Sequence, residues 1–160
     1  LLRGLVQPGV NQAQALDWTV AALAECCSAA GESGVRIVVE PINRYETTLV
    51  NTVAQGLELI DRVGAANLGL LFDTFHANIE EPSIEGSLLA AGARLFHVHV
   101  ADSNRWYPGG GHLDFPSLLR ALAATGYRGY VSGEFLPIPD AATGAQEAIK
   151  NLRGWVQRPL

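Results

Sequence analysis

Four residues with side chains that can bind a divalent cation stand at or near the ends of four short apolar segments. They are Glu40, Asp73, His99 and Glu134, in segments 35–40, 68–73, 95–100 and 130–134. Two Glu, one Asp and one His make an oxygen-rich set without thiols, which suits Mn²⁺, Co²⁺ or Mg²⁺ and, less clearly, Zn²⁺. The spacing therefore predicts a cation site assembled from distant parts of the chain.

Each of these residues alone also has an ordinary structural interpretation. Glu40 or Glu134 could cap a following helix, and Asp73 could begin a turn. His97 and His99 share one face by the two-residue period of a strand, so we expect one of them, His97, to be a hydrogen-bonded core histidine. Four cation-binding residue types at four successive strand ends are much harder to obtain by accident, and the joint interpretation is favoured.

Helical segments alternate with these apolar runs. We expect helices from Asn11 to about Ala30 with Gly31 as the stop, from Thr52 to Val63 before Gly64, from Ser83 to Gly92, and from Asp114 to Gly126. Short apolar strands alternating with helices predict βαβ units and a parallel sheet that is either doubly wound or closed into a barrel. In a barrel, side chains at the carboxyl ends of the strands line the active site.

Composition excludes several classes of function. The 160 residues carry a net charge of −5 with Lys and Arg scattered, which argues against a nucleic-acid surface. No segment approaches the roughly 20 apolar residues of a membrane helix, and no signal peptide is evident, so we expect a cytoplasmic protein. The sequence begins at Leu1 and lacks methionine, which predicts that the chain is cut from a longer one.

Four longer motifs identify a family resemblance. They are residues 40–46 (EPINRYE), 72–81 (FDTFHANIEE), 97–105 (HVHVADSNR) and 109–115 (GGGHLDF). In this order they resemble the xylose isomerase-like TIM-barrel superfamily of sugar phosphate isomerases and epimerases, and within it the D-tagatose and D-psicose 3-epimerases and 5-keto-L-gluconate epimerase. The resemblance implies an α/β fold, a (β/α)8 barrel, with residues 1–160 as the C-terminal part of a single domain (about strands 4 to 8) and 2–6 as the end of strand 4.

The resemblance also implies roles for individual residues. Glu40, Asp73, His99 and Glu134 would hold one divalent ion, Mn²⁺ first, with Glu40 and Glu134 also serving as catalytic acid and base. Substrate contacts are implied for Glu46, His76, Arg105 and His112, whereas Asp114 is expected to be a helix cap.

The chemistry implied is epimerisation, or isomerisation, of a ketose or keto-sugar acid. A proton beside a ketone is too weakly acidic for a carboxylate alone, so a divalent cation that chelates the carbonyl would stabilise the enediolate. Two carboxylates on opposite faces of the substrate could then remove and return the proton. The expected partner is a small sugar or keto-sugar acid, with no nucleic acid and no membrane, and a homo-oligomer is left open.

Other interpretations remain at this point. Hydroxypyruvate isomerase and an inositol-catabolism dehydratase belong to the same superfamily, and a truncated, catalytically inactive fragment is the alternative of another class. Endonuclease IV is disfavoured because it needs an Asp-x-His pair where this chain reads His112-Leu113-Asp114. A parallel sheet without its partner strands leaves open edges, so we expect the isolated chain to be weakly stable or self-associating.

Overall fold

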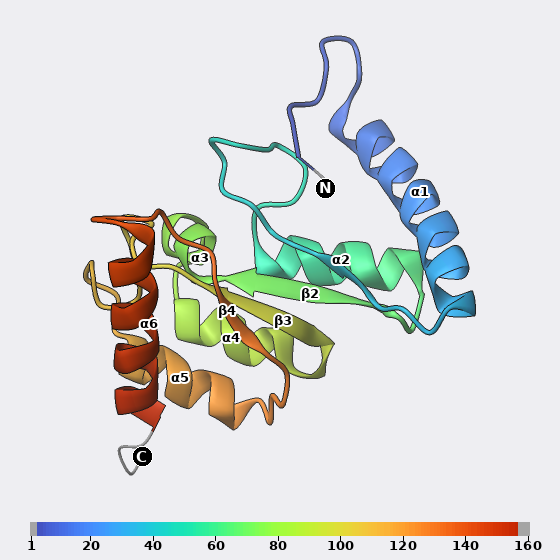
Figure 1. The fold of residues 1–160 in the computed structure, drawn as a ribbon. Helices are drawn as coiled ribbons and strands as arrows, with labels where there is room; N and C mark the ends of the chain where they lie inside the picture. The colour runs from blue at the N-terminus through green and yellow to red at the C-terminus, as the bar shows by residue number, and fades with distance from the viewer. Residues whose placement is uncertain (1–2, 157–160) are drawn as a thin grey trace.

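Four parallel strands form one sheet in the order β1-β2-β3-β4, so each strand lies beside its neighbour in the sequence (Figure 1). The computed structural model describes residues 3–156. The strands are β1 (Ile37–Val39), β2 (Leu68–Asp73), β3 (Leu95–Val100) and β4 (Val131–Gly133). All pairings are parallel, which confirms the expected sheet and brings the carboxyl ends of the strands to one edge.

Helices connect the strands and cover one face of the sheet. They are α1 (Gln12–Glu32), α2 (Val53–Val63), α3 (Thr74–Glu80), α4 (Ile84–Ala91), the 3₁₀ turn η1 (Gly92–Arg94), α5 (Phe115–Ala124) and α6 (Ala141–Val156). Neighbouring helices pack pairwise, α1 on α2, α2 on α4, α4 on α5 and α5 on α6 (Figure 1). None of the helices within residues 3–156 has the length and apolarity needed to span a membrane.

The strands contribute alternate side chains to the helix-covered core. Leu70, Phe72, Val98 and Val100 are each at most 3% exposed and belong to the same apolar cluster. On the opposite face Val38 is 37% exposed. One face of the sheet is therefore packed under helices, while the other is the face from which Asp73 and His99 reach the strand ends.

Polar side chains define where most helices begin. Asn11 accepts a hydrogen bond from the backbone N–H of Gln14 at 2.8 Å, and Thr52 forms a reciprocal capping box with Gln55. Asp114 accepts from the backbone N–H of Ser117 at 3.1 Å, which confirms its expected role as a helix cap. These local bonds explain why the starts of α1, α2 and α5 follow the sequence closely.

The expected end of α1 at Gly31 is wrong by a small margin. The helix continues to Glu32, and Ser33 is its C-terminal cap. The left-handed residue that turns the chain toward β1 is Gly34, with φ of 66°, rather than Gly31. A glycine within a long alanine-rich helix lowers helix stability without ending it, because the surrounding turns still form their hydrogen bonds.

Two helices were absent from the sequence prediction. Helix α3 begins directly after Asp73, where a turn was the expected alternative, and α6 covers residues for which no element was predicted. At the N-terminus, the expected end of a preceding strand is represented by one parallel bridge between Gly4 and Thr47, while Leu2 lies outside the described residues. Within residues 3–156, β1 and β4 form the two edges of the sheet.

Close packing around Gly69 gives a test of the sheet. A Cβ at this position would lie 2.7 Å from Cδ1 of Phe96, and nearer still to other ring atoms, so Gly69→Ala should lower the free energy of unfolding by about 1–3 kcal/mol. The matched control is Gly154→Ala on α6, where no atom would contact the added methyl group. Urea unfolding followed by circular dichroism measures both variants; a neutral Gly69→Ala would contradict the packing described.

Candidate metal centre and active site

The four residues predicted to bind a cation stand at one edge of the sheet. Asp73 is the last residue of β2 and His99 is its register partner on β3. Glu40 directly follows β1, and Glu134 directly follows β4. Because parallel strands end on the same side, residues up to 94 positions apart in sequence, Glu40 and Glu134, approach one another here.

Three of these side chains converge with His76 in place of the predicted His99, and His99 lies beside two of them. One ligand atom from each of Glu40, Asp73, His76 and Glu134 lies within 4.8 Å of the others. Nδ1 of His99 lies 3.9 Å from Oε1 of Glu40 and 3.7 Å from Oε2 of Glu134. Two atoms that bind opposite sides of one cation at ordinary bond lengths are about 4.2 Å apart, so this spacing allows a shared ion.

Three buried atoms in this cluster have no hydrogen-bond partner among the described residues. They are Oε1 of Glu40, Oδ2 of Asp73 and Nδ1 of His99. Buried polar atoms are almost always paired, and leaving one unpaired costs free energy. The three orphan atoms stand at the ends of three different strands, with those of Glu40 and His99 3.9 Å apart, so the residues fit a divalent cation on their own geometry.

The two carboxylate oxygens of Asp73 have different environments. Oδ1 accepts hydrogen bonds from the backbone N–H groups of Phe75 at 2.7 Å and His76 at 3.1 Å, which caps α3. Oδ2 remains unpaired. The same carboxylate therefore fixes the start of α3 and directs its other oxygen to the candidate metal centre.

Burial shifts the pKa values of several side chains in this cluster. It raises the pKa of Glu40 to about 7, with further contributions from the negative charges of Asp73 and Glu134. It also raises the pKa of Asp73 to about 7, against the lowering effect of the backbone N–H groups of His76 and Phe75. Burial lowers the pKa of His99, which favours the neutral imidazole that can bind a metal.

His76 is brought into the cluster by α3, but its ring has a different environment. Its Nδ1 accepts a hydrogen bond from the backbone N–H of Asn43 at 3.4 Å and lies 2.8 Å from Nδ2 of the same residue. Because Nδ1 accepts, the neutral ring carries its proton on Nε2 and presents a donor there. This tautomer suits a contact to a substrate oxygen better than a metal bond.

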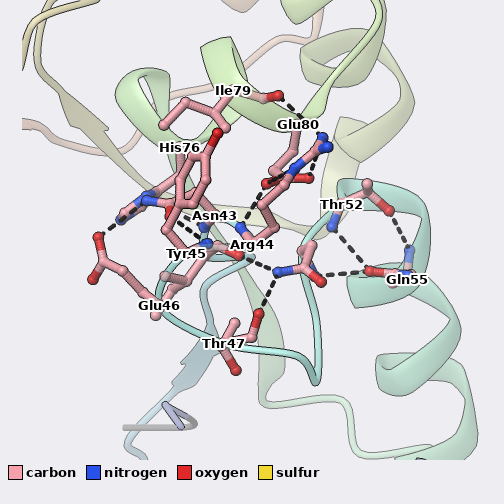
Figure 2. Close-up of polar contacts among 12 residues, drawn as sticks. Asn43, Arg44, Tyr45, Glu46, Thr47, Thr52, Gln55, His76, Ile79 and Glu80 are labelled. Atoms are coloured by element: carbon pink, nitrogen blue, oxygen red, sulfur yellow. Dashed lines mark hydrogen bonds and ion pairs between the residues drawn. The ribbon is translucent and has the colours of Figure 1, made fainter. Parts of the chain in front are cut away.

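The loop that follows β1 holds His76 in this orientation. Figure 2 shows Asn43 between the ring of His76 and the carboxylate of Glu46, to which Asn43 Nδ2 donates at 3.0 Å. Arg44 binds Glu80 on α3 through its backbone N–H and its guanidinium group (Figure 2). Asn43 is 2% exposed and was not singled out from the sequence, where an Asn in a loop has no pattern that distinguishes it.

Arg105 links the remaining predicted residues to the cluster. Its Nη2 donates to Oε2 of Glu134 at 3.1 Å, its Nη1 lies 3.5 Å from Oε1 of Glu46, and its guanidinium carbon lies 4.8 Å from the centre of the Phe75 ring. Glu46 also pairs with Arg3. Sequence reasoning missed the role of Phe75 as the aromatic surface on which Arg105 rests.

The two other histidines lie outside the group of ligand atoms. Nε2 of His97 pairs with the Ser132 hydroxyl at 3.1 Å, in keeping with its expected structural role on β3. His112 is exposed, and its Nδ1 lies 3.0 Å from the Ser103 hydroxyl. The structure places His112 on the loop that bears Arg105, and its predicted contact with substrate stays a prediction.

These features define an α/β protein of the parallel-barrel class, with side chains that could hold a cation at the carboxyl ends of its strands. The sequence profile of the xylose isomerase-like TIM barrel family matches residues 1–155. The chain belongs to this family, which confirms the resemblance seen in the motifs.

Named relatives agree with the family assignment. Over 116 residues the chain is 43% identical to L-ribulose 3-epimerase of Methylomonas sp. (strain DH-1), covering 72% of this chain and 41% of that protein. It is 37% identical over 102 residues to 3-dehydro-D-guloside 4-epimerase of Escherichia coli (strain K12), covering 64% and 39% respectively. The chain thus spans about two fifths of the length of these relatives.

A solved structure shows the same fold. D-allulose 3-epimerase from Methylomonas sp., crystallised with D-allulose, superposes with a TM-score of 0.86 and 32% sequence identity, covering 92% of this chain and 58% of that one. The fold described here therefore corresponds to somewhat more than half of that related chain.

Removing one cation-binding carboxylate should separate metal binding from helix capping. Asp73→Asn keeps an oxygen that can cap α3 but replaces a charged ligand, so its affinity for Mn²⁺ should fall by about 100-fold or more. The matched control is Asp114→Asn, which changes the cap of α5 in the same way away from the cluster. Isothermal titration with Mn²⁺ measures both; equal affinities in the two variants would contradict the assignment.

The raised pKa of Glu40 predicts a pH-dependent cost of folding in the absence of metal. A carboxyl with a folded-state pKa near 7 and an ordinary unfolded pKa contributes stability below about pH 4, and this contribution is lost as the pH rises through 7. With chelator present, Glu40→Gln should therefore be more stable than the unmodified protein by on the order of 2 kcal/mol near pH 8. The difference should shrink toward pH 5, and excess Mn²⁺ should reverse its sign at the higher pH.

Urea titrations at the two pH values, with and without Mn²⁺, measure this difference. Glu147→Gln on α6 serves as the control, because Glu147 pairs with Lys150 on an exposed helix surface. A Glu40→Gln variant that is less stable than the unmodified protein in chelator would contradict the prediction.

Proposed function

We propose that the protein epimerises a ketose or keto-sugar derivative by moving a proton at the carbon beside the carbonyl, and that residues 1–160 are the C-terminal part of its single barrel domain. The observation that supports this most directly is the set of three orphan atoms on Glu40, Asp73 and His99 beside Glu134. The named relatives are epimerases that act at carbon 3 of a ketose or carbon 4 of a keto-glycoside, as their names state.

Glu40, Asp73, His99 and Glu134 would hold one divalent cation. When bound, the cation would supply a Lewis acid that polarises the substrate carbonyl and makes the neighbouring proton more acidic. The oxygen-rich set and the neutral imidazole suit Mn²⁺, and Co²⁺, Mg²⁺ or Zn²⁺ would be alternatives.

Glu40 and Glu134 are suited to be the acid and base of the reaction. They follow β1 and β4, the two strands at opposite edges of the described sheet, and yet both approach His99. Two carboxylates that approach a substrate from opposite directions can remove a proton from one face and return it to the other, which inverts the carbon.

The residues around this pair would orient the substrate. Nε2–H of His76 is a donor for a substrate oxygen, and Arg105 is held between Glu46 and Glu134 where it can bind a hydroxyl group or direct the Glu134 carboxylate. His112 and Glu46 complete the set of proposed substrate contacts. No phosphate-binding glycine motif supports a phosphorylated substrate, so an unphosphorylated sugar is favoured.

Isotope exchange in D₂O tests the reaction and the two carboxylates together. The full-length protein with Mn²⁺ should introduce solvent deuterium beside the carbonyl of L-ribulose, D-allulose or a 3-keto-glycoside, as measured by NMR. Glu40→Gln and Glu134→Gln should each lower the rate of epimerisation by about 10²–10⁴-fold. Each variant should still exchange the one epimer whose proton faces the remaining carboxylate.

Glu147→Gln is the control and should keep the rate of the unmodified protein. Absence of deuterium uptake from every substrate, in a protein that binds Mn²⁺, would contradict the proposed chemistry. Identical exchange of both epimers by Glu40→Gln would contradict the two-carboxylate arrangement while leaving epimerisation intact.

A further inference from the structure

Asp102 is a fully buried carboxylate just beyond β3 that the proposed reaction does not use. Its side chain is 0% exposed, and its partners are backbone N–H groups of the loop that follows. Oδ1 accepts from Ser103 at 2.8 Å and from Leu113 at 3.1 Å, and Oδ2 accepts from Gly109 at 2.8 Å. A single carboxylate thus binds the beginning, the middle and the end of the segment 103–113.

The backbone of Asp102 is tied to the same segment. Its N–H donates to the carbonyl of Trp106 at 2.9 Å, and its carbonyl accepts from the N–H of Arg105 at 2.8 Å. A Cβ on Gly111 would overlap Oδ1 of Asp102 and would lie 2.7 Å from its carboxylate carbon. The loop is therefore closed tightly around this side chain, with room only for a glycine at position 111.

Arg105 occupies an unusual backbone conformation inside this turn. Its φ is 61°, and it is the one non-glycine residue with positive φ in the part of the chain that the structure describes. The left-handed conformation is unfavourable for a residue with a Cβ and persists only where surrounding contacts enforce it. The guanidinium group that emerges from it reaches Glu134, Glu46 and the face of Phe75.

We propose that Asp102 is a positioning residue: its buried carboxylate closes the loop 103–113 and thereby holds Arg105 against Glu46 and Glu134. The consequence for catalysis rests on the proposed function, whereas the consequence for the loop does not. Asp102 lies three residues after His99, so the same strand that presents an imidazole to the candidate metal centre also anchors the loop at its side.

A carboxylate is required at this position because all its partners are donors. An amide in its place would turn its NH₂ group toward at least one backbone N–H, whichever way it is oriented, and leave that donor unpaired. Burial alone would raise the pKa of Asp102, but the backbone N–H groups of Leu113, Ser103 and Gly109 reverse this and lower it. The side chain is therefore a charged acceptor, and charged acceptors form the stronger hydrogen bonds.

Proteolysis tests the loop without reference to activity. In Asp102→Asn, trypsin should cleave after Arg105 about tenfold faster than in the unmodified protein, because the freed loop enters the protease more readily. Cleavage after Arg120 within α5 should not change, which distinguishes loop opening from global unfolding. Gly111→Ala should have the same effect through steric overlap with the carboxylate, and Gly154→Ala should have none.

Kinetics test whether the loop acts through Arg105. With a substrate that the full-length protein epimerises, Asp102→Asn should lower kcat/KM by about tenfold or more, because a small displacement of a positioned group has effects of this size. Arg105→Ala should lower it further, and the double variant should match Arg105→Ala alone. If Asp102 contributed only to the overall structure, the losses of kcat/KM caused by Asp102→Asn and by Arg105→Ala would instead multiply in the double variant.

The outcomes separate this inference from the proposed function. Unchanged cleavage after Arg105 in both Asp102→Asn and Gly111→Ala would overturn the positioning role, as would multiplicative effects in the double variant. If the full-length protein epimerises no ketose, the proposed function fails while the proteolysis still decides whether Asp102 controls the loop. If Asp102→Asn does not fold, Gly111→Ala supplies the same two measurements with the carboxylate intact.

Discussion

The site depends on carboxylates being held close together out of water. Glu40 and Asp73 are both withdrawn from solvent next to Glu134, and each would ionise far more readily if it stood alone on the surface. Such an arrangement is unfavourable unless a positive charge compensates it, and the only cationic side chain described in contact with Glu134 is Arg105. The parallel sheet enforces the proximity, because its strands end together whatever residues they carry.

The free-energy cost of burying these carboxylates together explains how the residues around the cluster are arranged. Asp73 has one oxygen bonded to the start of α3, which fixes its carboxylate while leaving the second oxygen unpaired. Three residues after Asp73, the ring of His76 is held in place by Asn43 through Nδ1. The loop after β1, α3 and the strand ends therefore form one connected unit. In that unit, Asp73 and His76 are each held by a hydrogen bond through one of their polar atoms, which leaves the other free to face the candidate metal centre.

Much of the fold could be predicted from the sequence, because the strongest signals are local. Leu68–Asp73 and Leu95–Val100 have the predicted bounds, since each is a continuous apolar run between polar residues. Helix α3 could not be recognised, because its seven residues form two turns that are stabilised by tertiary contacts with the loop after β1. Helix α6 was missed because its amphipathic pattern is interrupted by Gly144, Asn151 and Gly154, which weaken the helical signal.

In the candidate site too, some residues could be placed from the local sequence, whereas others depend on contacts that are distant in sequence. The convergence of Glu40, Asp73, His99 and Glu134 follows from strand ends, so sequence spacing was enough to suggest it. The tautomer of His76 and the guanidinium contacts of Arg105 depend on partners far along the chain, and no sequence period reports them. In particular, Asp102 looks like an ordinary loop aspartate in the sequence. Only the structure shows that it gathers three backbone N–H groups and leaves Arg105 facing Glu134. The carboxylates proposed for catalysis are thus placed at strand ends by the sheet, whereas Arg105, which contacts Glu134, is placed by a loop folded around a buried carboxylate.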